Sequence, residues 1–181
     1  MVQESTCYTI DYMTFNIHPL VVHFPIALLV VYSIITLLPL RRWMPRVAWK
    51  QIGLVFLIVG VASAFAANST GEIAEHLVRP DHDLVEAHAF FAAASTWMYG
   101  LLLLGELLTL GGGRVASYIG QPIVTRILRF IEQVLQHPAL NTVLVLAGLV
   151  AIAVTGLLGG VMVYGVTADP LAPIVLRLLG L

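Results

Sequence analysis

Charge is scarce in this chain. Of its 181 residues only 10% are charged, and the formal net charge is -1, whereas an ordinary soluble domain carries about 25% charged residues. The nine Lys and Arg form no basic patch, which excludes nucleic acid as a partner. Hydrophobic residues make up 59% of the chain and the mean hydropathy is +0.94, so the composition predicts an all-α membrane protein.

Cysteine and the common catalytic motifs are also missing. Cys7 is the single cysteine, so no internal disulfide can form, and without a C-x-x-C-H motif haem is not expected to be attached covalently. No H-E-x-x-H motif, phosphate loop or nucleotide fingerprint occurs, which argues against hydrolytic and phosphoryl-transfer chemistry. We therefore expect an electron carrier or a subunit of a complex rather than a stand-alone enzyme.

Long apolar runs dominate the sequence. At roughly 20 residues per crossing, four stretches predict membrane spans within a single membrane domain, 1–181, at about 19–40, 51–68, 84–110 and 140–166. Small residues at Gly60 and Ala64, and the glycines of the fourth span, predict close helix packing. Residues 122–136 predict an amphipathic helix along the cytoplasmic membrane surface, with a plain connecting helix as the alternative.

The cations predict the orientation. Seven lie in the two loops that follow the first and third spans, at Arg41, Arg42, Arg46, Lys50, Arg114, Arg126 and Arg129. Because cytoplasmic loops carry the excess of Lys and Arg, we expect a bacterial inner membrane protein with both termini outside. His137 would then lie alone on the cytoplasmic side.

Five histidines fall at the opposite end: His18, His23, His76, His82 and His88. Imidazole is costly to place near a bilayer and is a common ligand of metals and haem iron. His23 and His88 each lie four residues past the start of a span, so at about 1.5 Å per residue they should share one depth. We expect them to bind haem b iron axially between helices. The alternative is that each hydrogen-bonds an oxygen of a neighbouring helix.

The remaining polar residues near the histidines have weaker roles. His18 is five residues from His23, about 140° around a helix, so it either caps the helix or joins His76 or His82 in a shallower site. His76 and His82, with the acidic loop around them, offer ligands for a divalent metal, although a solvated loop with helix caps is the simpler interpretation. Arg79 could pair with a haem propionate.

Glu106 is the one acid expected inside the third span. An acid at that depth either relays a proton or forms an ion pair, and we expect a pair with Arg41, Arg42 or Arg114.

The segment His18-Pro19-Leu20-Val21-Val22-His23-Phe24-Pro25 resembles a family of small bacterial membrane proteins catalogued as domain of unknown function 2231. Ser69-Thr70-Gly71-Glu72, His88 and Gly159-Gly160-Val161-Met162 are similar to the rest of its pattern, over about 17–165. The resemblance implies a role in electron transfer, since proteins of this family occur joined to Rieske-type or cytochrome c modules. His18, His23 and His88 are the matching positions. A single cysteine cannot build a Rieske centre, so the redox partner would be a separate protein or quinone.

These observations favour a membrane b-type cytochrome-like electron-transfer protein that binds haem near the outer leaflet. Its partners would be the lipid bilayer, quinone, periplasmic or membrane redox proteins, and a second copy of the chain. Two alternatives stay open: a non-catalytic membrane subunit or assembly factor of a redox complex, and a divalent-metal binder.

Overall fold

Four long helices form the molecule. The computed structural model describes residues 16–78 and 81–181, and within those ranges the chain is helical, with no strand. The four helices long and apolar enough to cross a membrane begin with α1 (His18–Val21) and α2 (His23–Leu37), which together form one span. The others are α4 (Trp49–Val78), α5 (His82–Ile119) and α7 (Pro138–Tyr164). The predicted four-helix membrane bundle is confirmed.

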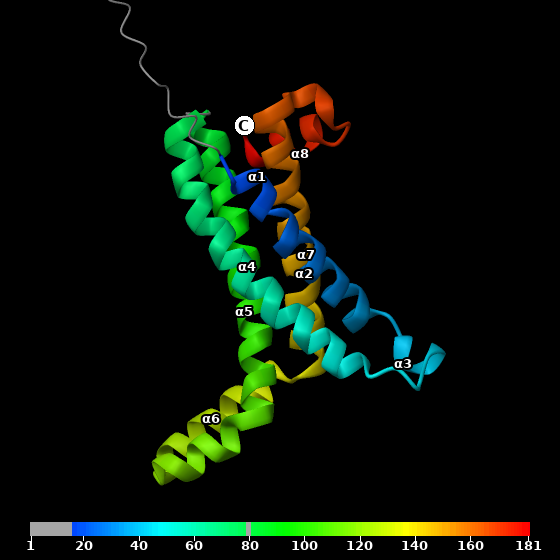
Figure 1. Cartoon of the computed structure of the whole chain (residues 1–181), viewed down its shortest axis with the longest axis vertical. Helices are drawn as coiled ribbons and strands as arrows, with labels where there is room; N and C mark the ends of the chain where they lie inside the picture. Colours follow the sequence, from blue (N-terminus) through cyan, green and yellow to red (C-terminus); the bar gives the residue numbers. More distant parts are fainter. Residues whose placement is uncertain (1–15, 79–80) are drawn as a thin grey trace, which may run out of the picture.

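Shorter elements cover the two ends of the bundle (Figure 1). Helices α3 (Leu40–Trp43) and α6 (Pro122–Leu135) lie at one end, and the 3₁₀ turn η1 (Val166–Ala168) and α8 (Ala172–Leu179) lie at the other, at the same end as α1. Helix α6 matches the predicted amphipathic segment closely. Helix α8 was not predicted, because a segment of eight residues is too short to span a bilayer.

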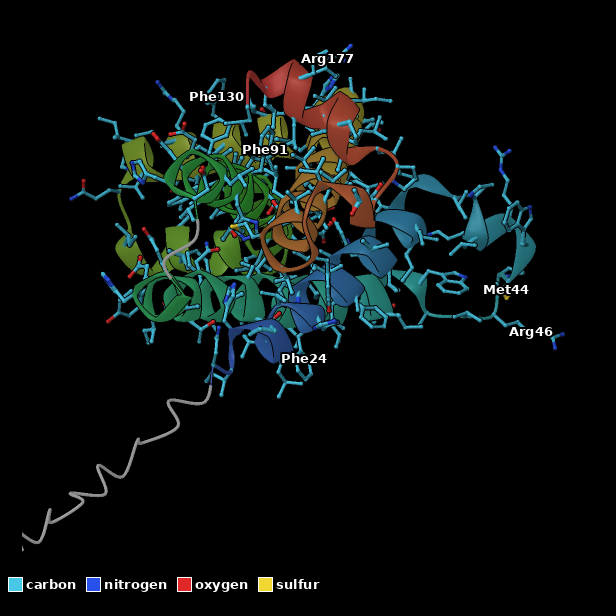
Figure 2. All side chains as sticks on the ribbon, turned by 90° about the horizontal axis from the view of Figure 1, so that it is seen from above. Phe24, Met44, Arg46, Phe91, Phe130 and Arg177 are labelled. Carbon is cyan, nitrogen blue, oxygen red and sulfur yellow. The ribbon has the colours of Figure 1, made fainter. Side chains whose placement is uncertain are left out.

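The spans pack as an up-down-up-down ring, in which α2 contacts α4, α4 contacts α5, α5 contacts α7 and α7 returns to α2. Large side chains from all four fill the centre, including Leu29, Leu57, Tyr99 and Val145, each at most 1% exposed. Many apolar side chains on the outer faces stay exposed, and Figure 2 shows Phe24 and Phe130 at the periphery. A bundle that is apolar both inside and outside is the pattern of a protein solvated by lipid.

Two predicted helix ends are wrong. Helix α4 does not stop at Asn68 but continues to Val78, because the Ser69 hydroxyl donates back to Phe65 O (3.2 Å) instead of capping a new helix. Helix α5 does not stop at Gly111–Gly113 but runs to Gly120, whose φ of 68° is the left-handed conformation that ends helices. Three glycines weaken a helix by about 1 kcal/mol each, and α6 lies against this part of the molecule and supports it.

Close helix contacts occur where small residues were expected, but not at every one. A Cβ on Gly60 would lie 2.5 Å from Leu29 Cδ2, so α4 meets α2 there as predicted. On α7 the close contact falls at Gly148, where a Cβ would lie 2.8 Å from the Tyr99 ring. Gly156 and Gly160, expected to pack, have nothing within 4 Å among the described atoms and face outward.

Glu106 forms an ion pair, although with a different cation from those expected. Lys50 Nζ lies 3.8 Å from Glu106 Oε2, whereas Arg41, Arg42 and Arg114 do not pair with it in the described part of the chain. Helix α4 begins earlier than predicted, which places Lys50 on its first turn, beside α5. The carboxylate oxygen is buried and accepts no hydrogen bond within the described residues.

Candidate metal centre

His18 opens α1 and turns toward α4. Its Nδ1 lies 3.0 Å from Thr70 Oγ1. The Thr70 hydroxyl donates its own proton to Ala67 O at 2.9 Å, so it accepts from His18 rather than donating. The imidazole lies over Gly71, where a Cβ would be only 3.2 Å from His18 Cε1. The absence of a side chain at Gly71 therefore lets the ring lie flat against α4.

His88 makes the corresponding contact with α7. Its Nδ1 lies 3.0 Å from Thr155 O, a carbonyl that can only accept, so Nδ1 carries the proton. The ring lies over Gly159, one helical turn after Thr155, where a Cβ would be 3.4 Å from His88 Cε1. The two arrangements are similar: a glycine makes room for the ring and an oxygen of the same helix accepts from Nδ1. That oxygen belongs to the adjacent residue at Thr70 and to a residue one turn earlier at Thr155.

The two imidazoles lie at the same end of the bundle (Figure 1). Both side chains are partly buried. They reach this place from different helices, α1 and α5, and each is held by a third and a fourth, α4 and α7. Figure 1 shows α1 near the upper ends of α4 and α5.

Fixing the proton on Nδ1 determines what Nε2 can do. In neutral imidazole one ring nitrogen donates and the other keeps a lone pair. Since Nδ1–H is used on both rings, each Nε2 keeps its lone pair, and neither is hydrogen-bonded among the described residues. A hydrogen bond from Nδ1–H to an oxygen is the usual support of a histidine that binds metal through Nε2. Each Nε2 is therefore able to accept a hydrogen bond or to bind a metal ion.

His23 lies elsewhere. His18, and not the expected His23, is the partly buried histidine of the first span, and it contacts α4. His23 is exposed, and its Nδ1 is 2.6 Å from Pro19 O of its own helix. The 140° between the two histidines means that only one can face the bundle, and the rotation of this span directs His18 inward. The helix is interrupted at Val22, shortly before Pro25, which lacks the N–H that would continue the helical hydrogen bonds.

The outer acidic loop does not assemble a metal site in the described part of the chain. His76 and His82 are exposed, and no group of three or more His, Cys, Asp or Glu lies close enough to bind an ion within 16–78 and 81–181. Arg79, the expected propionate partner, lies outside the described residues. Asp81 instead caps α5 by accepting from the backbone N–H groups of Asp83 and Leu84.

Four residues of the site were missed by reasoning from the histidines alone: Thr70, Gly71, Thr155 and Gly159. A signal for the first pair was available, since a Thr-Gly step in an apolar helix provides both an acceptor and a gap for a ring. Thr155 acts through its backbone carbonyl, which any residue would supply, so its side chain gave no signal.

The chain matches, over residues 14–169, the family described as predicted membrane protein (DUF2231). It belongs to that family. No curated protein and no solved structure matches the chain. The match covers both histidines and all four of their supporting residues, so the whole centre lies within the part of the chain that defines this DUF2231 protein.

Proposed function

We propose that His18 and His88 would hold the iron of a haem b and that the protein transfers electrons at the membrane. The observation that carries the proposal is the pair of imidazoles on different helices, each with Nδ1–H donated to an oxygen and Nε2 free. When bound, haem iron supplies a one-electron Fe(III)/Fe(II) couple.

The donor set fits this group. Neutral imidazole is a common ligand of haem iron, and helical bundles commonly hold cofactors between side chains of facing helices. His18 and His88 would hold the iron, Thr70 and the Thr155 carbonyl would orient the rings, and Gly71 and Gly159 would keep the space beside them clear. The partly buried position limits contact with water, which helps to set the potential of a bound iron centre.

The distribution of positive charge favours one side of the membrane for the histidine pair. The seven cations named above lie in the sequence segments at the end of the bundle opposite the histidines. With those segments in the cytoplasm of a bacterial cell, the histidine pair lies near the outer leaflet. Its redox partners would then be quinone within the bilayer and a protein on the outer side.

The test is a reduced-minus-oxidised visible spectrum of the full chain purified in detergent, beside His18→Ala, His88→Ala and His23→Ala. We expect sharp haem bands in the wild type, their loss in His18→Ala and His88→Ala, and their retention in the matched control His23→Ala. A folded wild-type protein that takes up no haem during expression or on reconstitution would refute the proposal.

A second candidate is a non-catalytic subunit of a redox complex, and one surface favours it. A groove of about 520 Å³ lies between α5 and α7 and is lined almost entirely by apolar atoms, with Phe90, Met98 and Val143 around alanines. A transmembrane helix of another subunit would fit there, since small residues permit close approach. In that case Ala94→Phe would abolish assembly of the complex, whereas His18→Ala and His88→Ala would leave assembly unchanged.

A further inference from the structure

Helix α6 presents two exposed surfaces that protein does not cover. Along one face, Ile123, Ile127, Phe130 and Val134 recur at helical spacing and are 67%, 52%, 65% and 41% exposed. A different face packs on α5, where Leu135 is buried and lies 3.1 Å from the position of a Cβ on Gly105. The exposed apolar stripe is therefore additional to the surface that α6 uses for folding.

Two arginines lie beside this stripe. Arg126 and Arg129 are three residues apart, so they share a face, and both are exposed. With Pro122, Thr125, Phe130 and Gln133 they line a surface groove of about 410 Å³. No ion pair to either arginine occurs within the described part of the chain. The groove thus combines two guanidinium groups, an amide and a hydroxyl with an aromatic ring at its edge.

An interfacial position of α6 would put this groove at the level of lipid headgroups. Helices α3 and α6 lie at the same end of the bundle (Figure 1), and α3 carries Trp43, which is 63% exposed. Trp49 lies nearby in sequence, and its Nε1–H donates to Met44 O at 3.1 Å. Tryptophan gathers at membrane–water interfaces, so the apolar stripe of α6 would meet acyl chains while its arginines meet the headgroups.

We infer that the α6 groove is a binding site for an anionic phospholipid, with Arg126 and Arg129 on the headgroup phosphate and the Ile127–Phe130 stripe against the acyl chains. Guanidinium groups bind phosphate oxygens through paired hydrogen bonds, and basic amphipathic helices bind anionic lipids in this orientation. The arginines explain selectivity for an anionic headgroup, which an apolar helix alone would not provide. This inference is independent of the histidine pair.

Native mass spectrometry of the full-length protein, titrated with phosphatidylglycerol or phosphatidylcholine, tests the site. We expect retained phosphatidylglycerol and little phosphatidylcholine. Because one arginine near an anionic surface contributes about fivefold, R126Q/R129Q should weaken phosphatidylglycerol binding about 25-fold. The matched control R41Q/R42Q removes the same charge from α3 at the same end and should change binding less than about threefold.

Several outcomes would overturn the inference. Equal losses in R126Q/R129Q and R41Q/R42Q would mean diffuse attraction rather than a site. Equal retention of the two lipids by the wild-type protein would also overturn the inference, and this comparison needs no variant. A dimer that dissociates in R126Q/R129Q would assign the surface to a second copy of the chain.

Discussion

At the residue scale, the centre depends on hydrogen bonds that leave Nε2 free on both histidines. Thr70 is the more easily tested of the two acceptors because it accepts through its side chain. Loss of an oxygen that orients a metal-binding histidine typically costs 10- to 100-fold in affinity. We therefore predict that Thr70→Val weakens haem retention by about that factor, as measured by haem content after dilution and gel filtration.

Thr36→Val is the matched control. Thr36 bonds only a carbonyl of its own helix, at 2.9 Å, as Thr70 also does, but no histidine donates to it among the described residues. Equal haem loss in both variants would mean that Thr70 supports the fold of α4 rather than His18.

The glycines under the two rings give a second prediction at this scale. A Cβ at Gly159 already reaches within 3.4 Å of His88 Cε1, so Gly159→Leu should push the ring away and remove most of the haem. Gly160→Leu, at the adjacent position with nothing within 4 Å, should retain it. Haem content per folded protein measures both, and full occupancy in Gly159→Leu would show that His88 needs no space there.

The identity of the histidine pair shows the limit of sequence reasoning at this scale. The sequence showed that His18 and His23 cannot share a face, but which one faces inward depends on the rotation of the first span. The shared depth of His23 and His88 stays a prediction, and the rotation of the span depends on side-chain packing against three other helices. The Thr70–Gly71 step was the one local indication that favoured His18.

At the scale of elements, the packing of α5 on α7 depends on Gly148 and Tyr99. A Cβ at residue 148 would lie 2.8 Å from the buried Tyr99 ring. Overpacking of this kind costs about 1–3 kcal/mol, so we predict that Gly148→Ala destabilises the bundle by that amount. Gly156→Ala, on the same helix with open space around it, should be neutral or stabilising, since alanine is the better helix former.

The measurement is unfolding of both variants in mixed detergent micelles, followed by circular dichroism. A Gly148→Ala protein as stable as the wild type would mean that α5 and α7 separate easily, contrary to the close contact described above.

A buried hydrogen bond joins α2 to α5. Its coupling energy measures how strongly this bond holds the two helices together. Ser33 Oγ lies 2.7 Å from Tyr99 Oη, and because Ser33 donates to Leu29 O, Tyr99 is the donor. Interhelical hydrogen bonds in membranes average about 0.6 kcal/mol. A double-mutant cycle of Ser33→Ala and Tyr99→Phe should give a coupling energy of that size, and zero coupling would contradict the bond.

The elements themselves were largely predictable. Hydropathy identified all four spans and the amphipathic helix, because length and apolar content decide whether a helix can cross a bilayer. The ends expected at residues 68 and 110 were too early, because backbone hydrogen bonding continues through Ser69 and through Gly111–Gly113. Such bonding is strongly favoured where water is absent.

At the scale of the whole molecule, the bundle is polarised, with the histidine pair at one end and α3, α6 and the cationic segments at the other. We predict that a cysteine at Thr167, in a Cys7→Ser background, reacts with a membrane-impermeant maleimide in cells whose outer membrane has been permeabilised. A cysteine at Arg46 should react only after the inner membrane is also opened. The reverse pattern would place the histidine pair on the cytoplasmic side.

The central claim, that His18 and His88 bind one haem iron, is tested most directly by the reduction potential of the reconstituted haem in three methionine variants. Replacing one axial imidazole by a thioether raises the potential. The account predicts a raised potential in His18→Met and in His88→Met and an unchanged one in His23→Met. A raised potential in His23→Met with no change in His18→Met would contradict the pairing, and a protein that binds no haem would contradict the proposed function.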